Sequence, residues 1–226
     1  MTRTKLGNTG ISVSEIVLGC WALGGGYTWG EQEEQASIDT VSAALDAGIY
    51  CFDTAEFYGD GRSEAVLGKA LRGRRSEAVI STKVWTANMD RQGVIRACEG
   101  SLGRLDTDYI DLLMIHWPNR SVPLAETLEA MESLKRSGKV RAIGVCNFGV
   151  RDLADALALV DIAADQLPYS LLFRAIEYDV LPACFRHEVP VMAYSPLAQG
   201  LLTGKFSSAA DVDDERARTR FYSKHR

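Results

Sequence analysis

Short apolar runs alternate with stretches of helical periodicity along most of the chain. These runs predict strands over 16–18, 49–52, 79–81, 109–115, 142–145, 164–167 and 189–193. Between them, segments such as 31–47 and 124–137 place apolar residues three and four positions apart, as one face of a helix does. Sustained alternation of strand and helix predicts a parallel sheet covered by helices.

Two further segments precede the first of these strands. Residues 3–6 and 11–13 flank the turn cluster Gly7-Asn8-Thr9-Gly10, which predicts a small antiparallel hairpin. The alternation that follows suits either a (β/α)8 barrel or an open doubly wound sheet. A complete G-x-G-x-x-G motif does not follow the first strand, because Trp29 stands where the third glycine would be. This counts against a Rossmann-type sheet.

Composition narrows the class of protein. The chain has 226 residues, of which 46% are hydrophobic and 24% charged, as in an ordinary globular domain. The net charge of -5 argues against a nucleic-acid partner. Signal-peptide and membrane-spanning patterns are lacking, and the five cysteines are odd in number and form no C-x-x-C motif. We therefore expect a cytoplasmic protein with reduced thiols and no membrane partner; its oligomeric state is left undetermined.

The last part of the chain differs from the rest. Residues 206–226 are rich in charge and nearly without aliphatic side chains, so we expect a loop or a disordered segment there. An eighth strand and a closing helix are not apparent after Lys205. We expect one domain over 1–226 in which the last β/α unit of a barrel is missing.

Polar side chains follow the predicted strands at their carboxyl ends, where barrels place their active sites. Asp53, Lys83 and His116 lie at or just beyond strand ends, and Tyr58 follows Asp53 by five residues. Each alone is better explained by a structural role, but their recurrence favours a site. A lysine ammonium lowers the pKa of a nearby phenol, and an imidazole can orient a substrate oxygen. This set suits protonation of a carbonyl oxygen, and the accompanying hydride requires a nicotinamide cofactor.

Several ordered fragments resemble the aldo-keto reductases, in particular the bacterial and plant-type enzymes. The fragments are FDTAEFYG at 52–59, STKV at 81–84, YIDLLMIHWP at 109–118, GKVRAIGVCNF at 138–148, QLPYSLL at 166–172 and YSPLAQGLLTGK at 194–205. The resemblance implies a (β/α)8 TIM-type barrel that reduces aldehydes or ketones to alcohols with NADPH, bound without a Rossmann domain. It also implies that Tyr58 is the general acid, that Asp53 and Lys83 tune it, and that His116 orients the carbonyl.

The same resemblance assigns the surroundings of these four residues. It implies a substrate pocket lined by Trp21, Trp85 and Trp117. The residues that it implies for cofactor binding are Asn147, Gln166, Tyr194, Ser195, Leu197, Gln199 and Gly200. Cys146 replaces the small hydroxyl residue usual in the family. The residues that read the adenosine 2′-phosphate follow the eighth strand in the family, so the sequence does not exclude NADH.

Three other interpretations stay open. A regulatory subunit of the same fold that senses the redox state of the cofactor is the alternative to an enzyme. Tyr27 and Trp29 are either a pocket lid or loop packing, and Glu56 is either solvated or a local salt-bridge partner. A metal site is not expected, because none of the three histidines has ligand spacing to another.

Overall fold

The computed structural model describes residues 2–26, 29–208 and 211, and its centre is a curled parallel sheet. Seven strands pair in the order β3-β4-β5-β6-β7-β8-β9, each parallel to its neighbour. Their bounds are β3 Val17–Gly19, β4 Cys51–Asp53, β5 Val79–Val84, β6 Ile110–Ile115, β7 Val140–Cys146, β8 Asp165–Pro168 and β9 Val191–Tyr194. The fold class is thereby confirmed as α/β, in the form of a partial (β/α)8 barrel.

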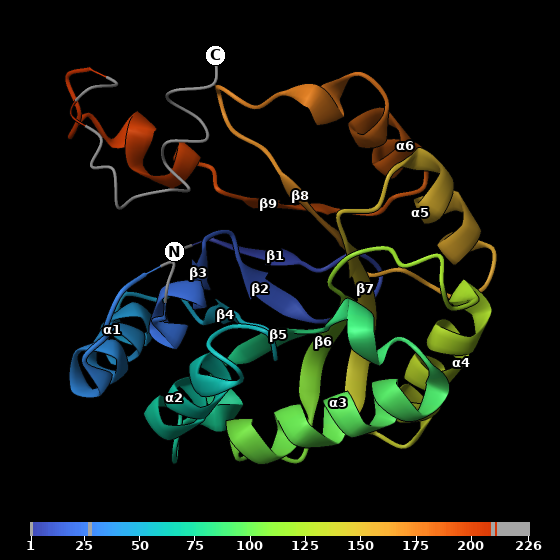
Figure 1. Ribbon diagram of the computed structural model, residues 1–226, viewed down its shortest axis with the longest axis horizontal. Coiled ribbons are helices and arrows are strands. Elements are labelled where there is room, and N and C mark those ends of the chain that lie inside the picture. Colours follow the sequence, from blue (N-terminus) through green and yellow to red (C-terminus); the bar gives the residue numbers. More distant parts are fainter. Residues whose placement is uncertain (1, 27–28, 209–210, 212–226) are drawn as a thin grey trace.

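Helices cover the outer side of the sheet, as Figure 1 shows. The α-helices are α1 Glu34–Asp46, α2 Arg62–Ala70, α3 Arg91–Leu105, α4 Leu124–Arg136, α5 Val150–Leu157 and α6 Val180–Arg186. The short 3₁₀ segments are η1 Trp21–Gly24, η2 Arg75–Glu77, η3 Thr86–Asn88, η4 Ala175–Glu177 and η5 Ala198–Thr203. The longest helix, α3, begins where the Asp90 carboxylate accepts the backbone N–H of Gly93 at 2.9 Å, a capping bond.

Strand β6 shows how the sheet separates two apolar layers. Leu113 and Ile115 belong to the large cluster that the helices share with the outer face of the sheet. Leu112 and Met114, on the alternate side, pack in a second cluster inside the curl. That inner cluster also holds Leu6 and Ile11, which lie between the strands of the predicted hairpin, β1 Arg3–Lys5 and β2 Ser12–Ser14. The hairpin is therefore confirmed, and it covers one end of the curl.

Strands β3 and β9 form the two edges of the sheet. Within the residues that the structure describes, neither edge pairs with another strand. A cavity of about 570 Å³ lies on the inner side of the curl, and the hairpin, β3 and β9 contribute to its lining. Asp53, Gln166 and Tyr194 also line it, so the interior is continuous with the carboxyl ends of the strands. The expected charged segment 206–226 lies mostly outside the described residues.

Two segments differ from the sequence-based expectation. Strand β5 continues beyond Ser81 to Val84, because Thr82 and Lys83 are buried and pair with Leu113 and Met114 of β6. Segment 194–205, which follows the last predicted strand and is expected to be a loop, is partly ordered. It contains the 3₁₀ turn η5, which is interrupted by non-helical backbone.

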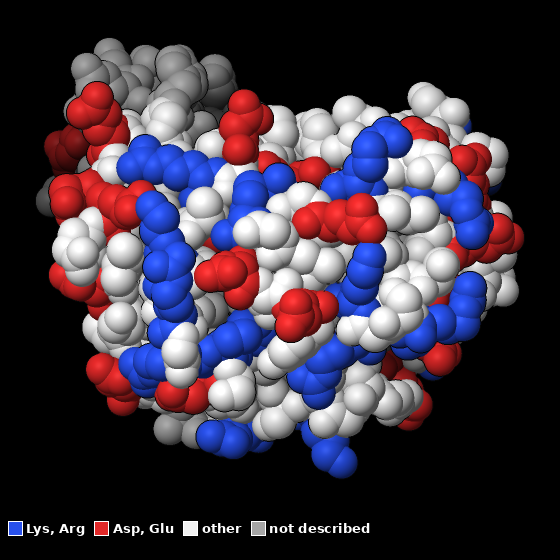
Figure 2. Space-filling view, turned by 90° about the horizontal axis from the view of Figure 1, so that it is seen from below, with Lys and Arg blue, Asp and Glu red and all other residues white. Residues whose placement is uncertain are grey.

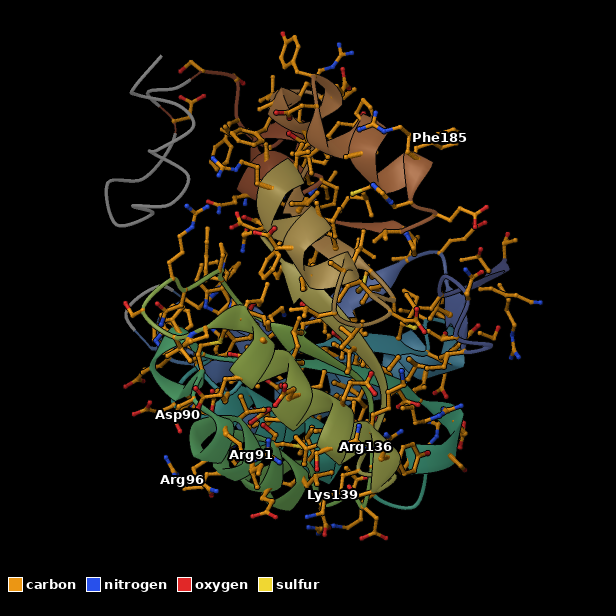
Figure 3. The ribbon with its side chains drawn as sticks, turned by 90° about the vertical axis from the view of Figure 1, so that its right-hand side faces the viewer. Asp90, Arg91, Arg96, Arg136, Lys139 and Phe185 are labelled. Atoms are coloured by element: carbon orange, nitrogen blue, oxygen red, sulfur yellow. The ribbon has the colours of Figure 1, made fainter. Side chains whose placement is uncertain are left out.

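Charged side chains of both signs are mixed on the face of the molecule seen in Figure 2. Among the ion pairs of the described residues is that of Lys139 with Glu99, whose Nζ and Oε1 are 2.8 Å apart. Figure 3 shows Arg91 and Arg96 of α3 on the outside of the helical layer, and the largely exposed Phe185 projecting from α6. Among the described helices, none has both the length and the apolar character needed to cross a membrane.

Candidate functional site

Adjacent strands bring three of the predicted site residues to the same edge of the sheet. Asp53, the last residue of β4, lies opposite Ser81 in β5, and Lys83 is two residues further along the same face. His116 directly follows β6, whose final residue Ile115 pairs with Val84. Because parallel strands end together, one edge of the sheet holds the carboxylate, the ammonium and the imidazole.

Lys83 and Asp53 form a buried ion pair. The Lys83 Nζ lies 2.9 and 2.8 Å from the two Asp53 carboxylate oxygens and donates to the carbonyl of Thr54 at 2.8 Å. Burial disfavours the ammonium, but the Asp53 carboxylate, together with smaller effects of Tyr58 and Cys146, more than offsets this and holds the pKa of Lys83 above its usual range. The lysine is therefore a fixed cation.

Tyr58 approaches that cation from the loop between β4 and α2. Its hydroxyl lies 3.5 Å from Lys83 Nζ, which also lies 5.1 Å from the centre of the phenol ring. Burial raises the pKa of Tyr58, and the Lys83 charge lowers it by less. The direction of the lysine effect on this pKa is the predicted one, but burial, which the sequence does not reveal, prevails. Tyr58 is therefore a protonated phenol at neutral pH.

The His116 ring borders both Tyr58 and Trp85. Its centroid lies 5.6 Å from that of Tyr58 and 5.1 Å from that of Trp85, edge to face in each case. Burial, with a smaller effect of the Lys83 charge, lowers the pKa of His116 to about 3. The Nδ1 atom is buried and has no hydrogen-bond partner among the described residues. The imidazole is accordingly neutral.

Gln166 and Ser81 complete the surroundings of Asp53. The Gln166 Nε2 and the Ser81 hydroxyl each donate to Asp53 Oδ1 at 3.0 Å. The Gln166 Oε1 accepts from the Cys146 thiol, with 3.6 Å between sulfur and oxygen. Gln166, which the resemblance assigns to the cofactor, thus also contacts the predicted catalytic group.

Asn147 and Tyr194 lie beside these residues at the ends of β7 and β9. The Tyr194 hydroxyl donates to Asn147 Oδ1 at 2.9 Å, and Asn147 Nδ2 donates to the carbonyl of His116 at 3.1 Å. Asn147 has a φ of 62°, an uncommon value for a residue other than glycine. These bonds place an amide side chain and an aromatic ring next to the four predicted catalytic residues.

The loop after β9 turns repeatedly through left-handed backbone. Ser195, Gln199 and Gly200 have φ values of 53°, 57° and 104°, and Leu197 between them is exposed. At Gly200 a Cβ atom would lie 3.1 Å from the Cε of Lys205, so glycine suits both the dihedral angle and the space. All four predicted residues of this loop therefore follow Tyr194 closely, on an irregular backbone segment.

Aromatic side chains border the Tyr58 ring. The Trp21 ring stacks on Tyr58 at a centroid distance of 5.8 Å, and Trp29 meets Trp21 edge-on at 5.7 Å. Trp117 is 43% exposed and makes no ring contact with the other described aromatic residues. Tyr27 lies outside the described residues. Two of the three predicted pocket tryptophans, Trp21 and Trp85, therefore contact the candidate site through their rings.

A glycine lets the η1 segment pack against the backbone that carries Tyr58. A Cβ atom at Gly24 would lie 2.9 Å from the carbonyl carbon of Tyr58 and from the amide nitrogen of Gly59. Any larger residue would push the two segments apart. The position of Tyr58 therefore depends on close backbone contact as well as on its own loop.

Three residues contribute to the site although the sequence analysis did not assign them to it. Ser81 lies two residues before Lys83, and strand periodicity alone could have placed both on one face. Phe57 stacks on Trp85 at 3.9 Å, and no sequence signal marks that contact. Glu56, expected to be solvated or in a salt bridge, instead accepts the backbone N–H of Trp85 at 2.6 Å.

Comparison with known proteins gives a consistent result. A model described as the aldo/keto reductase family matches residues 15–225. Aldo-keto reductase YhdN of Bacillus subtilis (strain 168) is 42% identical, over 92% of this chain and 65% of that protein. The NADH-specific methylglyoxal reductase of Escherichia coli (strain K12) is 38% identical, over 90% of this chain and 70% of that protein. The chain thus spans about two thirds of the length of these relatives.

A solved structure extends the likeness to three dimensions. An aldo-keto reductase from Klebsiella pneumoniae in complex with NADPH superimposes with a TM-score of 0.80 at 40% identity. The similarity covers 88% of this chain and 70% of that one. It therefore includes most of the curled sheet and its helices.

Proposed function

Because the chain belongs to the aldo/keto reductase family, we propose that it reduces aldehydes or ketones to alcohols with NAD(P)H. The observation that carries the proposal is the position of Lys83 Nζ, bonded to Asp53 and within 3.5 Å of the Tyr58 hydroxyl. A protonated phenol beside a fixed cation is suited to giving up its proton as negative charge forms on a substrate oxygen.

The residues at the ends of β7, β8 and β9 fit a nicotinamide cofactor. Asn147 and Gln166 offer side-chain amides that could bond a carboxamide, and Tyr194 offers a ring against which a flat heterocycle could stack. The left-handed backbone at Ser195 and Gly200 provides a turn that could approach a pyrophosphate closely. When bound, such a cofactor would supply the hydride for the carbonyl carbon.

Residues of the chain itself would donate the proton and stabilise the charge that remains. Tyr58 donates its hydroxyl proton to the carbonyl oxygen, and the Lys83 ammonium stabilises the phenolate that remains. Asp53 keeps Lys83 charged and in place. Neutral His116 offers an N–H to orient the carbonyl oxygen, and the rings of Trp21 and Trp85 exclude water beside it.

Relatives differ in the cofactor that their names and structures report. The Klebsiella pneumoniae reductase is seen with NADPH, whereas the Escherichia coli methylglyoxal reductase is named as NADH-specific. We propose NADPH as the preferred cofactor, with NADH as a possible substitute. The five cysteines are free and buried, which supports a reducing, cytoplasmic setting for the proposed activity.

Replacing the proton donor tests this function. In the variant Tyr58→Phe we expect carbonyl reduction to fall by roughly 10²- to 10⁴-fold, with the affinity for NADPH nearly unchanged. Oxidation of NADPH and NADH with a panel of aldehydes gives the rate, and a ligand-induced rise in the unfolding midpoint reports binding. The matched control is Tyr50→Phe, because the Tyr50 hydroxyl lies away from the candidate site and, among the described residues, hydrogen-bonds with Ser12 of the hairpin, at 3.2 Å.

Two results would contradict the proposal. If Tyr58→Phe kept most of the wild-type kcat, the proton would come from another group. If the wild-type chain bound NADPH but turned over none of the aldehydes, the cofactor-sensing regulatory function would be the better interpretation.

A further inference from the structure

Glu56 connects the loop that carries Tyr58 to the strand that carries Lys83. It lies between β4 and α2, two residues before Tyr58, and is half-buried. Its Oε1 accepts the backbone N–H of Trp85 at 2.6 Å and the side-chain amide of Asn88 at 3.0 Å. Trp85 directly follows β5, two residues after Lys83. One carboxylate oxygen therefore links the loop that carries Tyr58 to the segment that follows the strand carrying Lys83.

The next residue of the loop holds the same tryptophan by its ring. Phe57 stacks on Trp85 with 3.9 Å between centroids and 12° between planes. The Trp85 ring in turn meets the edge of His116 at 5.1 Å. Glu56 thus fixes the backbone of a residue whose ring borders both Phe57 and His116.

Geometry at Tyr58 leaves little tolerance for movement of this loop. The 3.5 Å between the Tyr58 hydroxyl and Lys83 Nζ is already long for a hydrogen bond. Lys83 cannot follow the tyrosine, because Asp53 and the Thr54 carbonyl hold it. The separation of the pair therefore depends on where the loop places the phenol.

We propose that Glu56 is a positioning residue that sets the Tyr58–Lys83 separation by anchoring this loop to the end of β5. This role rests on the proposed carbonyl reduction, but the effect of Glu56 on Tyr58 can be measured without catalysis. Positioning requires an acceptor oxygen at the site of Glu56 Oε1, and it does not require a negative charge there. An amide oxygen at the same atom can accept both hydrogen bonds, so Glu56→Gln should retain the function. Glu56→Ala and the shortened Glu56→Asp should lose it.

Titration of Tyr58 tests the inference without turnover. Protein labelled with 3-fluorotyrosine is titrated by ¹⁹F NMR, and the Tyr58 signal is assigned by its absence in Tyr58→Phe. In Glu56→Ala and Glu56→Asp we expect the pKa of Tyr58 to rise above the wild-type value, because the stabilising cation is then further away. Glu56→Gln should match the wild type.

A matched control separates this effect from general loss of a hydrogen bond. Glu126 Oε1 accepts the backbone N–H of Arg91 at 3.0 Å between the outer helices, so Glu126→Ala removes a similar bond elsewhere. We expect the Tyr58 titration to be unchanged in that variant. In the aldehyde assay, kcat should fall roughly 10- to 100-fold in Glu56→Ala, the scale expected for a small misplacement of a catalytic group, and remain near wild type in Glu56→Gln.

The results distinguish failure of the positioning role from failure of the proposed reaction. A Tyr58 titration that is the same in folded Glu56→Ala or Glu56→Asp as in the wild type would overturn the inference, as would a Glu56→Gln variant that behaves like Glu56→Ala. If the wild-type chain reduces no aldehyde while the titrations differ as expected, the positioning role stands and the proposed reaction fails.

Discussion

Gln166 donates its side-chain N–H to the Asp53 carboxylate across 3.0 Å, although 113 positions separate the two residues in the chain. Lys83 and Ser81 of β5 donate to the same carboxylate. Asp53 is therefore held by groups from two other strands, and its orientation is fixed before any ligand binds.

Removing Lys83 alone should cost more stability than removing the whole ion pair. Lys83→Met leaves the Asp53 charge buried without a cation, which typically destabilises by about 3–5 kcal/mol. Adding Asp53→Asn removes that charge, so the double variant should recover part of the loss. Urea unfolding followed by circular dichroism gives the free energies. A double variant less stable than Lys83→Met would contradict this account.

His116 should remain neutral throughout the physiological range. Burial and the Lys83 charge lower its pKa to about 3, far below the ordinary 6.5. Between these values the unfolded state binds a proton that the native state does not bind. The free energy of unfolding should therefore decrease as the pH falls from 6.5 towards 3. Nitrogen NMR of the imidazole should show a neutral ring from pH 5 to 8, with His116→Gln for assignment. Protonation of that ring within this interval would refute the expectation.

Asp165 should make the protein less stable as the pH rises from about 4 to about 8. It is fully buried on β8, neither oxygen forms a well-aligned hydrogen bond within the described part of the chain, and burial raises its pKa to about 8. From pH 4 to 8 the native state retains a proton that the unfolded state releases. Stability should therefore fall with rising pH, by up to about 1.4 kcal/mol per pH unit, and level off above pH 8.

The isosteric variant Asp165→Asn isolates this effect, because it cannot ionise. We expect it to be more stable than the wild type at pH 8 and to lose the slope assigned to Asp165. Unfolding free energies measured at several pH values would show whether the slope persists, in which case another group is responsible.

The cysteines should react slowly in the native protein. All five are free and buried, and burial raises the pKa of each thiol, for example to about 12 at Cys146. The reactive thiolate is therefore scarce at neutral pH. A colorimetric thiol reagent should label little of the folded chain and all five thiols in urea. A rapid reaction of one thiol in the native state would show that it is accessible and ionised.

Local pattern was sufficient for most of the fold. Apolar periodicity located the strands and helices to within a few residues, and the glycine-rich turn at 7–10 correctly indicated the hairpin. Asp53, Lys83 and His116 could be identified because polar residues that follow apolar strands in a parallel sheet meet at one edge. Strand β5 was predicted too short because the polar Thr82 and the charged Lys83 end the apolar run, and their buried partners Glu64 and Asp53 come from other elements.

Contacts that depend on curvature could not be inferred in this way. The bond between Gln166 and Asp53 requires β8 to curl back towards β4, and no local pattern encodes that distance. The net effect on the pKa of Tyr58 depends on how deeply the phenol is buried, which composition does not reveal. The role of Glu56 likewise depends on a backbone N–H, a group that every residue but proline possesses.

The order of the strands also has a consequence for how the chain folds. From β3 to β9 each strand pairs with the one that precedes it in sequence, so every pairing within the described sheet closes a loop of modest length. A chain made from its N-terminus can add each strand to an edge already in place. The sheet can therefore grow during synthesis, one strand and helix at a time, and the bond from Gln166 to Asp53 forms only when β8 arrives.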